Sequence, residues 1–350
     1  MSKFDNFNPE NKLRIPLSAY AAQIIDNDCK NFYKKRTTLI NLIILNFHLE
    51  ASCSISLKLK NFESDLSKCL GEKDQKRNED IISKILSEMA KKLSEDYTVH
   101  KESDVNWQIT LNKKVKELLT LDPHSSEEKY YKNRPGRYVK ALLEEYALQP
   151  YHIREKIVYK QTLEVIKNAI EDQNILHIIN LNGNHFYIKP YIQMTDPLSM
   201  YHYLIGYNAM PPSFNADKTT IPPAKVISFR LSRITNIEPQ PFPSGEITAS
   251  EKNQILKELN EKGVQFVSGD TTSIKVWLSD LGIVMYNTRL HLRPSAIVDE
   301  SDDHIYYFEC TETQILYYFF SFGSEAKILS PDSLVGKFRS QYANALALYQ

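Results

Sequence analysis

The sequence predicts an α+β fold made of three successive parts, and three observations support this. A pattern of one short strand followed by two helices occurs twice in the first 150 residues. One helix and four strand-like segments follow between residues 151 and 243, and an aromatic run with a terminal amphipathic helix lies within 244–350. A chain of 350 residues, 42% hydrophobic and 25% charged, has the length and composition for two or three globular domains.

The first copy of the repeat lies within residues 10–50. Polar and apolar residues alternate from Lys12 to Ser18, which is the period of a strand with one buried face. Ser18 is a favourable N-cap, and the apolar spacing after it predicts a helix. A basic stretch that ends in Arg36 then begins a second, more apolar helix.

The second copy lies within residues 105–150. Trp107, Ile109 and Leu111 stand 94 residues after the apolar positions of the first strand (107 − 13 = 94), and Asn112 takes the place of the first helix cap. Arg134 begins the second helix of this copy, 98 residues after its counterpart (134 − 36 = 98). Residues 51–104, between the copies, predict a helical insertion that links them.

A strand that stood alone would leave a row of backbone groups unpaired, so we expect the two copies to pair as an antiparallel ribbon. This is the ribbon-helix-helix pattern, here a pseudo-dimer within one chain, and such a ribbon can enter a DNA major groove. Its outward face would offer Lys12 and Arg14 from one copy and Gln108 from the other, with Arg36 and Arg134 as phosphate anchors at helix starts. The alternative is that the ribbon serves only folding or dimerisation.

Two segments of the middle part are recognisable. Residues 201–207, YHYLIGY, and 229–234, FRLSRI, resemble the two signature strands of WYL domains, and Lys189-Pro190-Tyr191 resembles the strand before them. The resemblance implies an Sm-like β-barrel over residues 151–243, with a pocket for a nucleic-acid or nucleotide ligand. By motif position, Tyr203 corresponds to the family tyrosine and Arg230 and Arg233 to the later arginines, whereas His202 stands where the family has tryptophan.

Arginine beside tyrosine and histidine suits phosphate binding combined with base stacking. Side chains alternate along a strand, so two arginines three residues apart share a face only if a bulge or a strand end intervenes. The alternatives are that Arg233 is a paired structural arginine and that Tyr203 is a core aromatic. The residues expected to bind a ligand here are Tyr203, Arg230, Arg233, His202, Lys189 and His185.

Residues 244–350 are similar to the small α/β extension that often follows WYL domains. The order of ribbon-helix-helix module, WYL domain and extension resembles the WYL accessory proteins of type VI-D CRISPR-Cas systems. That resemblance implies a homodimer that binds single-stranded RNA and stimulates the effector nuclease. The alternative is a DNA-binding transcription regulator whose WYL domain senses a ligand.

Composition and motifs argue against other classes. Lys+Arg and Asp+Glu both number 43, so any attraction for nucleic acid must come from local patches. The phosphate-loop, zinc-protease and serine-hydrolase motifs do not occur, and the four cysteines are scattered, so we expect no catalysis, cofactor or metal site. Neither a signal peptide nor an apolar run of membrane-spanning length is found, so we expect a cytoplasmic protein without membrane association.

Overall fold

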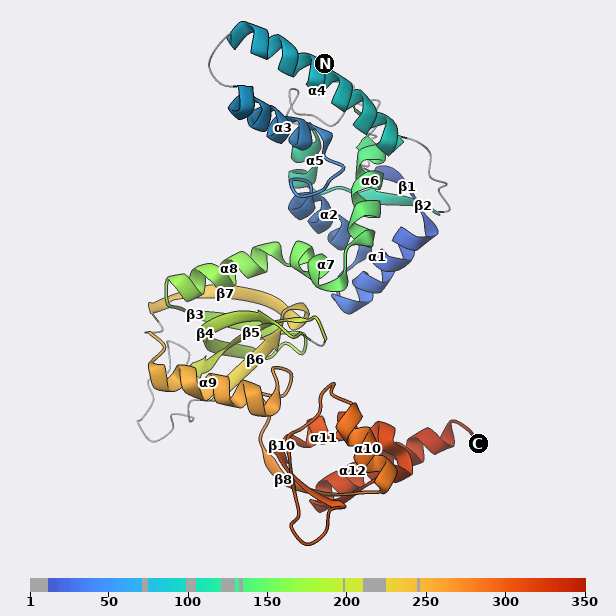
Figure 1. The fold of residues 1–350 in the computed structure, drawn as a ribbon, viewed down its shortest axis with the longest axis vertical. Coiled ribbons are helices and arrows are strands. Elements are labelled where there is room, and N and C mark those ends of the chain that lie inside the picture. Colours follow the sequence, from blue (N-terminus) through green and yellow to red (C-terminus); the bar gives the residue numbers. More distant parts are fainter. Residues whose placement is uncertain are drawn as a thin grey trace. The chain divides into compact units, whose positions relative to one another are not determined.

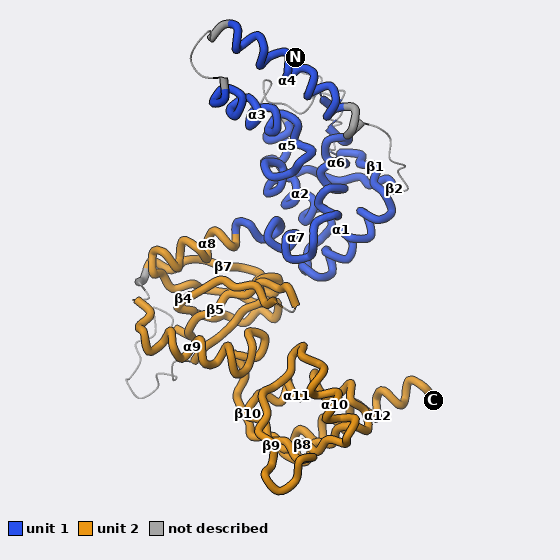
Figure 2. The backbone as a smooth tube through the Cα atoms, viewed as in Figure 1, with its two compact units in different colours: residues 1–161 blue, residues 162–350 orange. Residues whose placement is uncertain are grey.

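The computed structural model describes residues 12–70, 75–98, 105–120, 130–131, 135–197, 199–209, 225–243 and 246–350. Its helices and strands (Figure 1) belong to two compact units, residues 1–161 and residues 162–350 (Figure 2). Both units contain helices and antiparallel strands, so the α+β class is confirmed. The domain bounds expected from the sequence, 1–150, 151–243 and 244–350, stay predictions.

The first unit contains the strand-helix-helix order twice. The first set is β1 (Lys12–Leu17), α1 (Ala19–Asn31) and α2 (Arg36–Phe47). The second set is β2 (Val105–Thr110), α5 (Lys113–Thr120) and α6 (Pro135–Leu148). Two helices, α3 (Ile55–Leu70) and α4 (Gln75–Thr98), lie between the sets, and α7 (Tyr151–Val158) follows the second.

The strands β1 and β2 pair antiparallel, with Arg14 opposite Gln108 and Ile15 opposite Trp107. Period-two alternation sends the apolar side chains of both strands inward, and Ile15 is fully buried. Two-stranded ribbons are marginal in water, and here the ribbon gains its stability from packing on helices such as α6. The described pairing is the one that the repeat predicts.

Matching residues cap the first helix of each copy. The Ser18 hydroxyl accepts a hydrogen bond from the Ala21 amide at 3.2 Å, and the Asn112 side-chain oxygen accepts one from the Val115 amide at 2.8 Å. Each cap satisfies an amide that the helix itself leaves without a partner. The predicted equivalence of Ser18 and Asn112 is therefore seen in the hydrogen bonding.

The second helix of each copy holds the cap of the other copy. Glu144, on α6, accepts hydrogen bonds from the amide and the hydroxyl of Ser18, at 2.7 and 2.6 Å. Asn41, on α2, accepts one from the Asn112 amide at 2.8 Å and donates to the Thr110 carbonyl at 3.0 Å. These exchanged contacts tie the two copies into one folded body.

The second unit begins with a five-stranded antiparallel sheet in the order β6-β5-β4-β3-β7. Its strands are β3 (Asn174–Asn180), β4 (His185–Thr195), β5 (His202–Ala209), β6 (Val226–Arg230) and β7 (Ile234–Pro243). A 3₁₀ turn, η3 (Leu231–Arg233), joins β6 to β7, although these strands lie at opposite ends of the sheet.

That connection requires a strongly bent sheet. Five strands span about 19 Å between the outer two, whereas three residues of 3₁₀ helix advance only about 6 Å. Among the described residues, β6 and β7 do not pair with each other, so the strands form an open, bent sheet and closure into an Sm-like barrel stays a prediction. Figure 1 shows α8 (Lys160–Glu171) and α9 (Ala249–Lys262) on opposite sides of it.

Residues 272–347 form a separate sheet with helices. The order along the chain is β8 (Thr272–Leu278), α10 (Asp280–Thr288), β9 (Ala296–Val298), β10 (Ile305–Cys310), α11 (Glu312–Phe319), the 3₁₀ segment η4 (Phe320–Glu325), β11 (Ala326–Ser330) and α12 (Asp332–Ala347). The antiparallel order β11-β8-β10-β9 is that of the split β-α-β motif. One side of the sheet packs on the helices through a core that includes Phe308, Phe319 and Leu334.

Candidate nucleic-acid interface

The outward face of the ribbon is polar, and the residues of β1 and β2 on it include no carboxylate. Lys12 lies opposite Thr110, Arg14 opposite Gln108 and Pro16 opposite Asn106. All of these except the half-buried proline are exposed. Cations and amides on a two-stranded ribbon can contact phosphates and base edges, so the three predicted ribbon contacts Lys12, Arg14 and Gln108 share one surface.

Arg36 begins α2, where the N-cap residue Lys35 makes no side-chain cap. The Arg36 guanidinium binds Asp26 Oδ1 at 2.8 Å and lies over the Trp107 ring, 4.2 Å from the ring centroid. The side chain is 45% exposed, so a phosphate could reach it but would compete with the Asp26 carboxylate. The matching residue Arg134 lies outside the described residues.

In the bent sheet, Arg230 stacks on an aromatic ring. It is the last residue of β6, lies opposite Tyr203, and places its guanidinium carbon 3.3 Å from the centroid of the Tyr201 ring. The turn η3 begins at the next residue and ends with Arg233, so β6 ends between the two arginines, one of the possibilities that the alternation argument left open. Arg233 is exposed.

The structure places Tyr203 and His202 in the interior. Tyr203 is 7% exposed and packs in a cluster with Ile205 and Ile255, and His202 is 5% exposed. The core-aromatic alternative therefore describes the position of Tyr203, and the ring beside Arg230 is that of Tyr201, which the sequence reasoning missed. Tyr201 stands two residues before Tyr203, and period two alone would have placed both on one side of the sheet.

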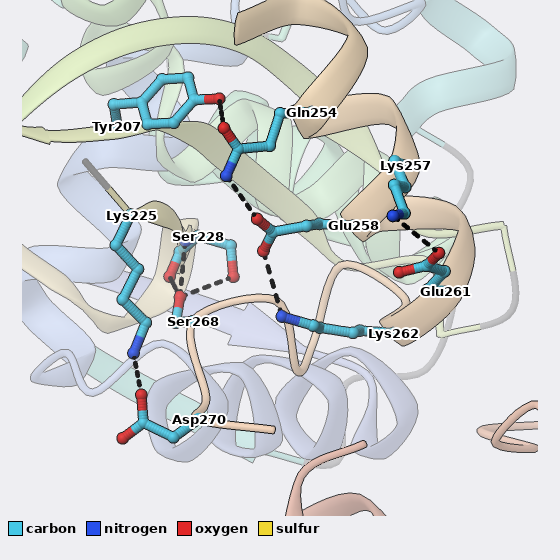
Figure 3. A network of polar contacts seen from close by, with 10 residues as sticks. All are labelled: Tyr207, Lys225, Ser228, Gln254, Lys257, Glu258, Glu261, Lys262, Ser268 and Asp270. Atoms are coloured by element: carbon cyan, nitrogen blue, oxygen red, sulfur yellow. Dashed lines mark hydrogen bonds and ion pairs between the residues drawn. The ribbon is translucent and has the colours of Figure 1, made fainter. Parts of the chain in front are cut away.

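Three lysines of the second unit are neutralised by carboxylates. Lys189 donates to the Glu246 carbonyl at 2.9 Å and lies 3.6 Å from Glu251 Oε2. The Thr248 amide lowers the pKa of the Glu251 carboxyl, with smaller contributions from the Thr248 hydroxyl and from Lys189. Lys225 pairs with an aspartate and Lys262 with a glutamate of its own helix, as Figure 3 shows. The predicted ligand residue Lys189 would have to leave a carboxylate to bind a phosphate.

A chain of polar contacts starts on β5 and continues along α9 (Figure 3). The Tyr207 hydroxyl donates to the Gln254 side-chain oxygen at 3.2 Å, and the Gln254 amide donates to Glu258 at 3.0 Å. Glu258 in turn accepts from Lys262 at 3.1 Å. Ile255 of α9 packs in the same cluster as Tyr203, so α9 covers this tyrosine.

The outer edge of β6 is closed by a serine. The Ser228 amide donates to the Ser268 hydroxyl at 2.7 Å, and the Ser228 hydroxyl donates to the Val264 carbonyl at 2.7 Å. Without these bonds, the Ser228 amide and hydroxyl could form hydrogen bonds with a strand added at this edge. Ligand recognition by strand addition is therefore disfavoured at this edge.

His185 is exposed at the start of β4, the central strand of the sheet. Its Nδ1 lies 2.9 Å from His177 Nε2, and the two rings lie side by side at an interplanar angle of 24°. Within the described parts of the chain, no three His, Cys, Asp or Glu side chains are grouped to hold a metal ion. No described helix combines the length and apolar character needed to cross a bilayer.

The chain is similar along its whole length to a solved structure described as a CRISPR Cas-related protein. The two are 21% identical with a TM-score of 0.66, and the match covers 100% of this chain and 97% of that chain. This chain shares that fold. Proteasome accessory factor B/C of Arthrobacter aurescens matches with 16% identity and a TM-score of 0.31 over 71% of this chain and 37% of that chain, too low to define a common fold. No protein-family model matches the chain, and no curated protein matches it significantly.

Proposed function

We propose that this protein is a non-enzymatic nucleic-acid-binding regulator that acts with CRISPR-Cas machinery, as the WYL accessory proteins of type VI-D systems do. Its principal ligand is single-stranded RNA, and its partner is an effector nuclease that it stimulates as a homodimer in the cytoplasm. The observation that carries the proposal is the stack of Arg230 on Tyr201 at the end of β6. The full-length fold match to a CRISPR Cas-related protein supports the choice of partner.

The Arg230–Tyr201 pair has the chemistry that an RNA site needs. A guanidinium is planar, and phosphate oxygens can accept from its N–H groups in pairs while an aromatic ring packs against its face. Unpaired bases stack on such cation and ring surfaces with little regard for sequence. A base within a duplex already has neighbours on both faces, so the site favours single strands.

Electrostatics should contribute little to this binding. The net charge is zero, and Lys189, Lys225 and Lys262 already have carboxylate partners. The salt dependence of RNA affinity reports the number of phosphates that cations neutralise. We therefore expect RNA affinity to fall with about the first or second power of salt concentration, a shallow dependence for a nucleic-acid-binding protein.

A second function is favoured by a different surface. The outward ribbon face, with Arg14 opposite Gln108, has the groups that read duplex DNA in a major groove. A transcription regulator would use this face on an operator and the bent sheet to sense a ligand. Because the two strands differ in sequence, that operator would not be a palindrome.

One filter-binding experiment separates the two functions. The full chain, Arg230→Ala, Arg14→Ala and the surface control Lys60→Ala are each titrated onto a labelled single-stranded RNA and onto mixed-sequence duplex DNA. The RNA function predicts tighter binding to RNA, about tenfold weaker for Arg230→Ala and unchanged for Arg14→Ala. The opposite pattern supports the DNA regulator, and equal failure to bind both polymers overturns the proposal.

The effector and the absence of catalysis are tested separately. Adding the full chain to a type VI-D nuclease with guide RNA should raise its cleavage rate, and Arg230→Ala should reduce that gain. The chain alone, with and without divalent metal, should leave the RNA intact. Cleavage by the chain alone would assign it to an enzyme class instead.

A further inference from the structure

Strand β9 is an exposed apolar edge of the C-terminal sheet. In the order β11-β8-β10-β9 it is a terminal strand, paired with β10 on one side. Ile297 is 70% exposed and Val298 is 44% exposed. Neither charge nor proline occurs within Ala296–Val298, and its register with β10 contains no bulge. Edges without these features are able to accept a further strand.

The two edges of the bent sheet, by contrast, are protected. At β6 the Ser228 amide and hydroxyl are already bound within the chain. At β7 the strand contains three prolines, which have no amide hydrogen to donate: Pro239, Pro241 and Pro243. The open edge at β9 therefore differs from the other sheet edges of the same unit.

The backbone of β9 presents a donor and an acceptor on its outer side. The Asp299 amide donates to the Ile305 carbonyl of β10 at 2.9 Å. Because pairs alternate in an antiparallel ladder, the backbone groups of Val298 and Ala296 point away from β10. The Ala296 amide faces the Tyr286 hydroxyl. The Val298 amide and the Ala296 carbonyl are thus directed toward the open edge.

The segments on either side of β9 carry opposite charge. Residues 289–293 include two arginines and a histidine and no carboxylate, whereas residues 299–303 include four carboxylates and no cation. The Arg289 guanidinium donates to the Ser321 hydroxyl at 2.8 Å, and neither it nor the exposed Arg293 forms an ion pair with a described residue. A strand with such flanks is complementary in charge to a second copy of itself that runs in the opposite direction.

We propose that β9 pairs antiparallel with β9 of a second copy of this chain, around a two-fold axis at Ile297. The Val298 amide of each copy donates to the Ala296 carbonyl of the other, and the two four-stranded sheets become one. Antiparallel pairing also places residues 299–303 of each copy beside residues 289–293 of the other, so unlike charges meet on both sides of the axis.

The inference rests on the homodimer of the proposed function and assigns its surface. In this chain β1 pairs with β2 of the same molecule, so the ribbon has no strand left to pair with another chain. A dimer therefore needs a different contact, and β9 supplies one in the other unit.

Charge reversal on the two flanks tests the pairing. Arg293→Glu and Glu300→Arg should each weaken self-association about tenfold, because each altered contact occurs twice in a symmetric dimer. An equimolar mixture of the two variants should recover association, since each altered flank then faces one of opposite charge. Lys327→Glu, on the opposite edge strand β11, is the matched control and should associate like the original chain. Sedimentation velocity over a range of concentrations measures all four.

The backbone and the axis can be tested directly. Val298→Pro removes the outward amide and should abolish the dimer. Ile297 faces itself across the axis with the two Cα atoms about 4.5 Å apart, a separation that a disulfide can span. Ile297→Cys should therefore cross-link on mild oxidation, in a Cys69→Ser background because Cys69 is exposed. Leu281→Cys, at a position of α10 that is 56% exposed, should not. Thermal melting shows that each variant is folded.

The outcomes separate this inference from the proposed function. If the original chain sediments as a monomer at every concentration, the proposed homodimer and the β9 interface both fail. If it dimerises, but Arg293→Glu, Glu300→Arg and Val298→Pro dimerise equally well and Ile297→Cys does not cross-link, the homodimer stands and only the β9 interface is wrong. The RNA affinity of Arg230→Ala is measured independently of both.

Discussion

Arg14 lies directly opposite Gln108 in the β1–β2 ribbon, and the two residues occupy equivalent positions in the two copies of the repeat (108 − 14 = 94). The local two-fold axis of the ribbon therefore passes between a cation and a neutral amide. The backbone of the ribbon is symmetric at this point, while its outward chemistry is not.

This pair makes a prediction for duplex DNA. Removing the guanidinium in Arg14→Ala should weaken binding to a preferred duplex by about 1–3 kcal/mol, the value of one good contact to a base edge. Gln108→Arg, which makes the two positions alike, should raise affinity and shift preference toward palindromic sites. Electrophoretic mobility shifts with selected duplexes measure both effects. Equal affinity of Arg14→Ala and the original chain for every duplex would restrict the ribbon to a folding role.

Asp28 is a buried carboxylate in the first unit, and its removal should be costly. Arg154 binds it through two nitrogens, at 2.7 and 3.1 Å, and the Tyr146 hydroxyl donates to it at 2.8 Å. Asp28 is fully buried, and Asp28→Asn leaves the Arg154 charge without its partner. We therefore expect a loss of about 3–5 kcal/mol in the free energy of unfolding. Urea denaturation measures it.

A surface ion pair provides the matched control for that variant. Asp26 binds Arg36 at 2.8 Å, but both side chains are more than 40% exposed, so water screens the pair. Asp26→Asn should cost no more than about 1 kcal/mol. Similar losses of unfolding free energy in the two variants would contradict the larger contribution expected from the buried Asp28 carboxylate.

Two helical glycines should respond to alanine in opposite ways. At Gly136, near the start of α6, an added Cβ would lie 2.6 Å from the Arg14 carbonyl oxygen of the ribbon, whereas at Gly336, within α12, it would meet no atom within 4 Å. Gly136→Ala should lower the unfolding free energy by about 1–3 kcal/mol. Gly336→Ala should raise it by about 0.5–1 kcal/mol, because alanine favours the helix. Melting temperatures that move in the same direction would refute the close packing of α6 on β1.

The Asp299 carboxylate should remain largely ionised at pH values between about 2 and its ordinary pKa of 3.8. The Ser301 hydroxyl and amide and the Tyr307 hydroxyl all donate to it and lower its pKa to about 2. The Asp299 pKa is lower in the folded state than in the unfolded state, so the ionised carboxylate stabilises the fold at pH values above the unfolded-state pKa. This stabilisation is lost as the pH falls toward 2. Carbon-detected NMR titration should give a midpoint near 2, rising toward 3.8 in Ser301→Ala. An unchanged midpoint in that variant would refute the hydrogen-bond explanation.

The cysteines should differ in reactivity with a thiol reagent at neutral pH. Burial raises the pKa of Cys310 to about 12 and that of Cys29 to about 11, whereas Cys69 is exposed. The thiolate is the reactive form, so Cys69 should be modified first. Mass spectrometry after brief labelling checks the order, and early labelling of Cys310 would show that its strand opens readily.

The repeat could be predicted from the sequence because its signals are local. Alternation in β1 and β2 and the caps at Ser18 and Asn112 depend on residues a few positions apart. The contacts that join the copies, from Glu144 to Ser18 and from Asn41 to Asn112, depend on residues 126 and 71 positions apart, and no local pattern indicates them.

The candidate ligand residues were harder to predict for the same reason. The motif identified the strands that carry Arg230 and Tyr203, but it could not show that α9 covers Tyr203 and leaves Tyr201 beside the arginine. The ion pair of Lys189 with Glu251 joins residues far apart in the sequence, so its charge looked available. A strand end between Arg230 and Arg233 was, by contrast, one of the possibilities that the alternation of side chains left open.

Because β1 pairs with β2 within a single chain, ribbon formation does not depend on protein concentration, and the two strands can mutate independently of each other. A ribbon built from two separate molecules dissociates at low concentration, whereas an intramolecular one persists in a cell that contains only a few copies. Each half can also acquire substitutions that its counterpart does not share, so a mutation at Arg14 leaves position 108 untouched.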